Sequence, residues 1–306
     1  MTMFDKGKRV TLRELVEKEQ VFAPCVYDCF SARAAEICGY KAALLTGGGL
    51  NGNMIGMPDM AFLNIEELIW ATDRICNYSP LPIIVDADDG YAESPAVVYY
   101  NVQRLVRAGA MAVTIEDSTG VRGYVRLMAD HKFQQANLVS EEVHLAKIKA
   151  AVEACKGTDC MVIARTALKY SYGLDKAMER CNKAMDIGAD MTLIVGINRP
   201  NSIVECSRIG EVVRGPKMYP DVGAVSHDAA PEVILADIMP FGFSLVTMHC
   251  FEGVAMTAMV ERGMRNIKYQ SNIESPSEVK RYGDNQNSKK ILEFERDCYK
   301  TATELK

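Results

Sequence analysis

Four carboxylate side chains crowd the segment that follows one apolar run. They are Asp86, Asp88, Asp89 and Glu93, within IIVDADDGYAESP at residues 83–95. Strand alternation predicts that Asp86 and Asp88 face the same side, and a second apolar run ends in Glu116 and Asp117. Carboxylates that converge in a wet pocket repel one another unless a cation neutralises them, and all-oxygen ligation suits Mg²⁺ or Mn²⁺. The pattern predicts a divalent metal site, although Asp89 or Asp117 alone is explained equally well as a helix N-cap.

An arginine and a glycine-rich segment follow two other apolar runs. Arg165 ends the run CMVIAR, and TGGGLNGN, residues 46–53, follows the run AALL. A glycine run after a strand exposes backbone N–H groups that can hold a carboxylate or a phosphate, and an arginine can clamp the same anion through two hydrogen bonds. Together with a metal, these groups would suit a small oxo- or hydroxy-acid whose enolate the cation stabilises.

Eight short apolar runs, separated by helical patterns, must position these groups. We expect strands at residues 22–28, 42–47, 82–88, 112–117, 160–165, 191–196, 216–221 and 244–250. Glycines such as Gly109 and Gly188 stand between a helical pattern and the next run, where a helix commonly ends. The repeat predicts an α/β fold, a (β/α)8 barrel of the TIM type, with catalytic groups at the carboxyl ends of the strands. An open doubly wound sheet is the alternative, although no GxGxxG follows the first run.

Two segments exceed a minimal barrel. Residues 118–137 form a long loop after the fourth expected strand, and such loops are usually functional or disordered. Residues 268–306 hold a polar stretch and then a helical pattern whose apolar side chains need a partner surface. We therefore expect a catalytic barrel domain over residues 1–267 and a C-terminal extension over residues 268–306 whose helix packs on another subunit.

The composition bounds the partners. A formal net charge of −5, spread along the chain, gives no electrostatic reason to expect a nucleic-acid partner. No run approaches the roughly eighteen apolar residues of a membrane-spanning helix, so no membrane partner is expected. Ten dispersed cysteines without a CxxC are typical of reduced, buried thiols. The composition predicts a cytoplasmic protein, and the metal, arginine and glycine-rich segment described above indicate a small carboxylic acid as its partner.

Four of these segments resemble the motifs of the isocitrate lyase/phosphoenolpyruvate mutase superfamily. They read TGGGLNGNMIGMPD (46–59), DADDGYA (86–92), TIEDS (114–118) and IARTAL (163–168), in the order of the family. The resemblance runs from about residue 8 to residue 200. It implies a barrel whose last helix is swapped between subunits, commonly in a homotetramer built as a dimer of dimers. It also implies chemistry that passes through a Mg²⁺-stabilised enolate of a small carboxylic acid.

Site residues carry over from the resemblance position by position. It implies that Asp86 binds Mg²⁺ directly, with Mn²⁺ as a possible substitute. The other implied ligands, direct or through water, are Asp59, Asp88 and Glu116. The implied cradle for the carboxylate and oxo oxygens of the substrate consists of Thr46, Gly47 and Gly48. Arg165 would hold a carboxylate.

The proton-transfer groups usual in the family are absent. Residues 118–135 contain no cysteine to match the K[KR]CGH loop of the lyases. The loop with which the phosphonate enzymes supply a Lys and an Asn is missing too. Catalytic groups must therefore come from elsewhere in the chain, and our candidates are Tyr91, Arg165, His131 and Asp221. The expected barrel mouth also offers His249, which follows an apolar run and is interpreted as a core histidine in preference to a catalytic one.

These features predict a Mg²⁺-dependent lyase that cleaves or forms a carbon–carbon bond in a small 2-hydroxy- or 2-oxo-carboxylic acid. One alternative is a phosphonopyruvate mutase or hydrolase, because Arg122, Arg126 and Lys132 would suit a phosphonate. The other is a non-catalytic relative that binds a metabolite. Retention of all four metal positions argues against it, since only the ion requires them together.

Overall fold

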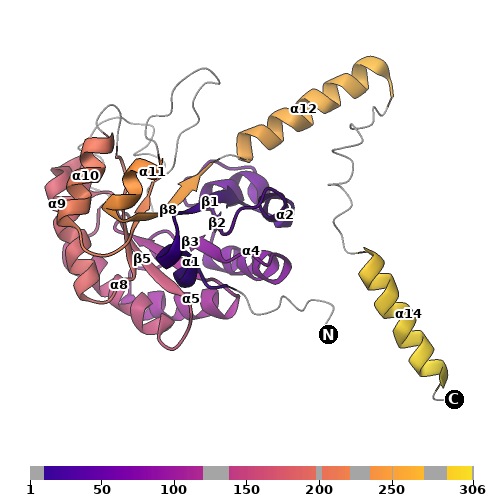
Figure 1. Cartoon of the computed structure of the whole chain (residues 1–306), viewed down its shortest axis with the longest axis horizontal. Coiled ribbons are helices and arrows are strands. Elements are labelled where there is room, and N and C mark those ends of the chain that lie inside the picture. Colours follow the sequence, from indigo (N-terminus) through magenta and orange to yellow (C-terminus); the bar gives the residue numbers. More distant parts are fainter. Residues whose placement is uncertain are drawn as a thin grey trace. The chain divides into compact units, whose positions relative to one another are not determined.

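The computed structural model describes residues 10–119, 138–197, 202–220, 235–249, 251–271 and 288–304. It forms two compact units. One spans Arg9–Glu252, and the other combines Met1–Lys8 with Gly253–Lys306. The first unit contains the strands and the helices around them (Figure 1).

Eight parallel strands close into a barrel in sequence order, with the last strand paired to the first (Figure 1). The strands are β1 (Val21–Val26), β2 (Ala43–Leu45), β3 (Ile83–Asp86), β4 (Ala112–Glu116), β5 (Met161–Thr166), β6 (Met191–Ile194), β7 (Lys217–Tyr219) and β8 (Phe243–Met248). Each strand overlaps the apolar run expected for it. The predicted (β/α)8 barrel is therefore confirmed.

Helices surround these strands. The longer ones are α1 (Leu12–Lys18), α2 (Cys29–Ile37), α4 (Ile65–Tyr78), α5 (Pro95–Arg107), α8 (Glu141–Cys155), α9 (Leu168–Asp186) and α10 (Ser202–Val212). Short turns are α3 (Gly47–Leu50), the π-helix η1 (Asn51–Ile55), α11 (Leu235–Ile238) and the 3₁₀-helix η2 (Met239–Phe241). Side chains of Thr11, Asp28 and Asn64 form capping boxes that satisfy the first N–H groups of α1, α2 and α4.

Two apolar layers lie on opposite faces of the closed sheet. In β3, Ile83 and Val85 belong to the layer between strands and helices, whereas Ile84 belongs to a second layer. That second layer takes side chains from all eight strands, so it fills the barrel interior. Leu12 and Leu15 of α1 join it. Because α1 immediately precedes β1, it covers the amino-terminal end of the barrel and leaves functional groups to the carboxyl end.

Glycines end helices where the sequence predicted. Gly109 and Gly188 follow α5 and α9, each with a φ of +105°. That backbone region is unfavourable for residues with a Cβ atom, so glycine turns the chain from helix to strand without strain.

The second unit contains α12 (Glu252–Tyr269), which starts at the last residue of the first unit, and α14 (Ser288–Glu304). Both helices expose large apolar side chains. On α14 these are Ile291, Leu292, Phe294 and Tyr299. The domain boundary expected after residue 267 and the swap of the last helix stay predictions. Within the described ranges, no helix is both long and apolar enough to cross a membrane.

Candidate active site

Three charged side chains form a layer at the carboxyl ends of β3, β4 and β5. Asp86, Glu116 and Arg165 point into the barrel, because each stands an even number of residues after an interior side chain of its strand. Arg165 Nη1 lies 3.1 Å from Asp86 Oδ1, and Arg165 Nε forms an ion pair at 3.0 Å with Glu116 Oε2. Thr114 donates its hydroxyl to Asp86 Oδ1 at 2.8 Å. One guanidinium therefore neutralises two of the four predicted metal ligands.

The glycine-rich segment is a helical turn rather than an open loop. The buried Thr46 stands at the N-cap position of α3, which continues into η1. A Cβ atom on Gly47 would lie 3.6 Å from Oδ1 of Asp88, and one on Gly48 would lie 3.4 Å from the Cβ of Asp59. Because these glycines have no side chain, the other two predicted metal ligands can approach the same turn closely.

The donor chemistry of this barrel mouth fits a hard divalent cation. The four candidate ligands are all carboxylates, namely Asp59, Asp86, Asp88 and Glu116. Oxygen donors of this kind suit Mg²⁺. Across the part of the chain that the structure describes, no three His, Cys, Asp or Glu side chains are already gathered as a metal site. The residues match the ion in chemical type, and its binding stays a prediction.

Asp88 lies beyond the end of β3, which corrects the expectation that strand alternation aligns it with Asp86. β3 ends at Asp86, and both Asp88 and Tyr91 have positive φ values of 51° and 54°. The Tyr91 N–H donates to Asp89 Oδ1 at 3.0 Å. The chain therefore turns sharply here, and this turn, not the strand pleat, directs the buried Asp88 side chain.

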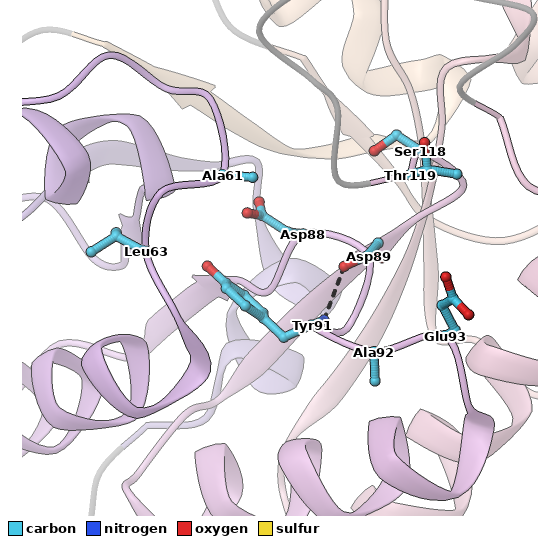
Figure 2. Close-up of a pocket in the computed structure, with 9 residues that line it drawn as sticks. All are labelled: Ala61, Leu63, Asp88, Asp89, Tyr91, Ala92, Glu93, Ser118 and Thr119. Carbon is cyan, nitrogen blue, oxygen red and sulfur yellow. Dashed lines mark hydrogen bonds between the residues drawn. The ribbon is translucent and has the colours of Figure 1, made fainter.

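A pocket of about 260 Å³ opens beside this turn (Figure 2). Its lining residues are Ala61, Leu63, Asp88, Asp89, Tyr91, Ala92, Glu93, Ser118 and Thr119. Figure 2 shows the Tyr91 hydroxyl and the Asp88 carboxylate on the side of the loop nearer Leu63, with Glu93 on the other side. The volume lies just below the usual range for drug-sized ligands and suits a small acid. Tyr91 is thus the one predicted acid or base that the described residues place in a pocket beside Asp88.

A buried lysine supports the same turn. Lys147 of α8 is 1% exposed, and its Nζ donates to the backbone oxygen of Asp89 at 3.0 Å and lies 3.3 Å from Asp89 Oδ2. Asn101 of α5 donates to the backbone oxygen of Gly90 at 3.0 Å. Asp89 is therefore a partner of Lys147 and not the N-cap of α5, which is Ser94. Sequence reasoning missed Lys147 because a lysine in a helical pattern is normally solvated.

Comparison with known proteins bears directly on this barrel mouth. Residues 12–232, which include the site residues described in this section, match the model of the Phosphoenolpyruvate phosphomutase family. The chain belongs to this family. The Petal death protein of Dianthus caryophyllus is 31% identical over 270 residues, which cover 87% of this chain and 79% of that protein. The 2-methylisocitrate lyase of Salmonella typhimurium is 32% identical over 211 residues, covering 69% of this chain and 63% of that enzyme.

Solved structures agree. The crystal structure of 2,3-dimethylmalate lyase, described as a PEP mutase/isocitrate lyase superfamily member, is 28% identical with a TM-score of 0.75, and the match covers 92% of this chain and 98% of that one. Oxaloacetate acetylhydrolase in complex with the inhibitor 3,3-difluorooxalacetate is 25% identical with a TM-score of 0.81, over 96% and 97% of the two chains. The predicted superfamily, and an enzyme of the carbon–carbon lyase type found in it, are confirmed.

In this member of the phosphomutase family, the adjacent acids Glu116 and Asp117 lie in different surroundings. Glu116 faces the barrel mouth, whereas Asp117 is fully buried outside it. Asp117 accepts hydrogen bonds from the Thr166 hydroxyl at 2.5 Å and the Ala167 N–H at 2.8 Å, and lies 3.5 Å from Arg180 Nη1. Asp117 is therefore neither a candidate metal ligand nor the cap of α8, the next helix that the structure describes, and it ties the end of β4 to the end of β5.

A neutral histidine lies next to this cluster. His144 of α8 is 1% exposed, and its Nε2 lies 3.4 Å from the backbone oxygen of Ile115. Burial lowers the pKa of His144, Asp117 opposes that shift, and Arg180 adds to it. The imidazole is buried in its uncharged form and has no place at the barrel mouth.

The remaining predicted groups fall into two classes. His131 and Asp221 lie outside the described residues, so their roles as acids or bases stay predictions. The interpretation of His249 as a core histidine is wrong. Its side chain is 39% exposed and its Nδ1 lies 3.1 Å from Glu252 Oε2. β8 ends one residue earlier than this position, so His249 is released from the apolar strand.

Proposed function

We propose that this member of the family is a Mg²⁺-dependent lyase that cleaves, or in reverse forms, a carbon–carbon bond in a small 2-hydroxy- or 2-oxo-carboxylic acid. The observation that carries the proposal is the position of Arg165, held between Asp86 and Glu116 at the barrel mouth. A fixed guanidinium beside hard oxygen ligands suits a small acid as substrate. The guanidinium would bind the carboxylate of the acid, and a cation held by the oxygen ligands would bind its hydroxyl or oxo oxygen. The names of 2-methylisocitrate lyase and 2,3-dimethylmalate lyase support this class of reaction.

The substrate would lie against α3 and Arg165. Thr46, Gly47 and Gly48 would cradle its carboxylate and oxo oxygens, because no Cβ atom stands between the two glycines and the centre of the mouth. Arg165 would hold a carboxylate with the same planar donors that now face two acids. This arrangement orients a small acid by its charges and leaves its substituent to the surrounding loops.

Four carboxylates would hold the ion. Asp86 would be the direct ligand, with the others binding directly or through water, namely Asp59, Asp88 and Glu116. Bound there, Mg²⁺ would stabilise the negative charge that develops on a substrate oxygen during cleavage. Mn²⁺ has the same ligand preference and is expected to replace it.

Cleavage also needs groups that move protons. Tyr91, His131 and Asp221 are the candidates from the sequence. Tyr91 has the support of geometry, because it lines the pocket beside Asp88 and its backbone is fixed by Asp89. A tyrosine in this position would orient the substrate or exchange a proton with it.

We also propose a cytoplasmic homotetramer, built as a dimer of dimers. The nine described cysteines are free, and most are buried, which suits a reducing compartment. The exposed apolar side chains of α12 and α14 supply surface for association.

The test is turnover of defined acids by the full chain. The protein is incubated with Mg²⁺ and separately with 2-methylisocitrate, 2,3-dimethylmalate, oxaloacetate and phosphonopyruvate, while pyruvate and phosphate are measured. We expect pyruvate without phosphate from at least one of the first three. Phosphate from phosphonopyruvate alone would replace the proposal with phosphorus–carbon chemistry.

Substitution of the central ligand tests the metal site. Asp86→Asn is expected to lower kcat at least about 100-fold and to abolish the rise in melting temperature that Mg²⁺ gives the wild type. Asp175→Asn, which alters an exposed aspartate paired with Arg208, is the matched control and should change neither. If no acid is turned over and Mg²⁺ stabilises Asp86→Asn as well as the wild type, the proposed function is wrong.

A further inference from the structure

The turn after β8 carries a histidine–glutamate pair. His249 follows β8 directly, and Glu252 is the first residue of α12. His249 Nδ1 lies 3.1 Å from Glu252 Oε2, and the two side chains are 39% and 31% exposed. An imidazole that a carboxylate holds at one nitrogen and that is partly exposed is the arrangement of an oriented acid–base group.

Packing fixes this turn on the barrel. The ring of Phe251 meets the ring of Tyr40 edge-on, with centroids 6.4 Å apart. The Tyr40 hydroxyl donates to Met248 Sδ at 3.7 Å, and Met248 pairs with Pro24 in the ladder between β8 and β1. The backbone on both sides of His249 is therefore held by contacts within the first unit.

Glu252 lies against the glycine turn that carries the proposed cradle. A Cβ atom on Gly49 would lie 2.6 Å from Oε1 of Glu252. The two glycines before it meet the carboxylates of Asp88 and Asp59 in the same way. Three successive glycines of one turn thus face three different carboxylates, and the third carboxylate holds His249.

The carboxylate of the pair lies beside a neutral phenol. Glu252 Oε1 is buried and accepts no hydrogen bond from any residue that the structure describes, so this carboxylate directs its other oxygen to His249. Tyr27, at the end of β1, lies beside Gly49. Burial raises the pKa of Tyr27, and the charges of Asp28 and Glu252 raise it further, so the phenol stays neutral.

We propose that His249 is a catalytic residue that delivers a proton in the lyase reaction, and that Glu252 is its positioning residue. This inference rests on the proposed function. It supplies the acid that residues 118–135 do not offer as a cysteine.

The proposed step balances without a redox partner. In a 2-hydroxy acid, the carbon–carbon bond breaks, its electron pair stays on the carbon next to a carboxylate, and the hydroxyl proton passes to solvent as the new carbonyl forms. The imidazolium of His249 gives its Nε2 proton to that carbon. This leaves a neutral imidazole that keeps its proton on Nδ1, where it forms a hydrogen bond with Glu252. Solvent then returns a proton to Nε2.

The first test measures turnover of whichever acid the wild type cleaves. His249→Ala is expected to lower kcat about 100- to 10,000-fold with KM changed less than about 3-fold, the usual range for loss of a general acid. Added imidazole should restore part of kcat in His249→Ala but not in Asp86→Asn. Thermal unfolding of the variant should match the wild type because the side chain is partly exposed.

The second test reads the tautomer of His249 by ¹⁵N NMR in metal-free protein, with His249→Ala identifying its signals. Glu252 should hold the proton on Nδ1. Glu252→Leu, which removes the acceptor, should shift the population to the Nε2–H tautomer, whereas Glu252→Gln keeps an acceptor oxygen and should retain it. Glu261→Gln, exposed on the same helix, is the control.

The outcomes separate the two proposals. If the wild type cleaves an acid and His249→Ala keeps kcat within about 2-fold, the role of His249 is wrong while the lyase proposal stands. An unchanged tautomer in Glu252→Leu would overturn the positioning role. If the wild type cleaves none of the acids, the proposed function fails, and the role of His249 fails with it.

Discussion

Glu116 and Asp117 are adjacent in sequence, yet each has its own arginine. Glu116 pairs with Arg165 inside the barrel, and Asp117 pairs with Arg180 in the helical layer. Because successive side chains of an extended chain point to opposite faces, the two charges are kept apart by the sheet. Both acids act on the same pair of strands, one at the site and one beneath it. Asp117 therefore ties together the ends of the two strands that carry Glu116 and Arg165.

Loss of the structural charge should be costly. Asp117→Asn is expected to lower the free energy of unfolding by about 2–4 kcal/mol, because it weakens two hydrogen bonds of this buried carboxylate and leaves Arg180, 6% exposed, with only the more exposed Glu141 as a counter-charge. Urea unfolding measures the change. Asp175→Asn breaks an exposed pair with Arg208 and should cost less than about 1 kcal/mol. Equal losses in the two variants would contradict the role of Asp117.

His144 should make stability depend on pH. Its folded pKa is lowered by burial, so below about pH 6.5 the unfolded chain binds a proton that the folded chain does not. Stability is then lost as the pH falls, with a slope of at most about 1.4 kcal/mol per pH unit from this group. Urea unfolding at pH 7.5 and pH 5.5 should show a loss about 1 kcal/mol larger in the wild type than in His144→Gln. Parallel losses would show that His144 is not buried in its neutral form.

Regular elements explain which site residues could be predicted. Asp86, Glu116 and Arg165 stand on strands, whose period of two residues fixes the direction of a side chain from the sequence alone. Asp88 stands in a turn and has a positive φ, so the two-residue period of a strand does not set the direction of its side chain. The prediction that strand alternation aligns Asp88 with Asp86 was therefore wrong in its reasoning. The surroundings of His249 could not be predicted from the sequence. Its partner Glu252 contacts Gly49, about 200 residues earlier in the chain, only after the barrel closes.

The turn after β3 is held by two helices as well as by hydrogen bonds within the turn. Asn101 of α5 donates to the backbone oxygen of Gly90, and Lys147 of α8 donates to the backbone oxygen and to Oδ2 of Asp89. The same turn carries Asp88, whose carboxylate lies next to Gly47 of α3. Helix packing therefore determines where a predicted metal ligand lies.

Removal of the Lys147 charge should weaken Mg²⁺ binding more than it lowers the stability of the fold. Lys147→Met keeps most of the buried apolar volume, and Asp89, whose side chain is 21% exposed, can turn to water, so unfolding should change by less than about 2 kcal/mol. Affinity for Mg²⁺, measured by calorimetric titration, should fall about 10- to 100-fold, as for other residues that orient metal ligands. Lys149→Met, exposed on the same helix, should leave it unchanged. An unaltered affinity in Lys147→Met would show that Asp88 is held without this contact.

Closure of the barrel brings together groups from both ends of the catalytic unit. β8 pairs with β1, so the turn after β8 meets the segment after β2, while β3, β4 and β5 bring the arginine and two acids to the same carboxyl end. α1 covers the opposite end with apolar side chains. An open sheet would leave the elements of β1 and β8 at separate edges. The complete mouth is a property of the closed molecule.

The C-terminal unit is expected to make the assembly. On α14, Ile291, Phe294 and Cys298 recur at helical spacing, with Leu292 and Tyr299 beside them, and the four large side chains among these are 41–70% exposed. A folded monomer rarely exposes so continuous an apolar stripe, so burial between subunits should stabilise it. Removal of residues 288–306, or the double change Leu292→Glu and Phe294→Glu, should therefore reduce the tetramer to smaller species in light scattering after size exclusion. Glu293→Gln, on the same helix, should preserve it. A wild-type monomer, or a tetramer that survives the truncation, would show that α14 is not the oligomerising element. Unchanged turnover in the smaller species would show that the whole catalytic site lies within one barrel.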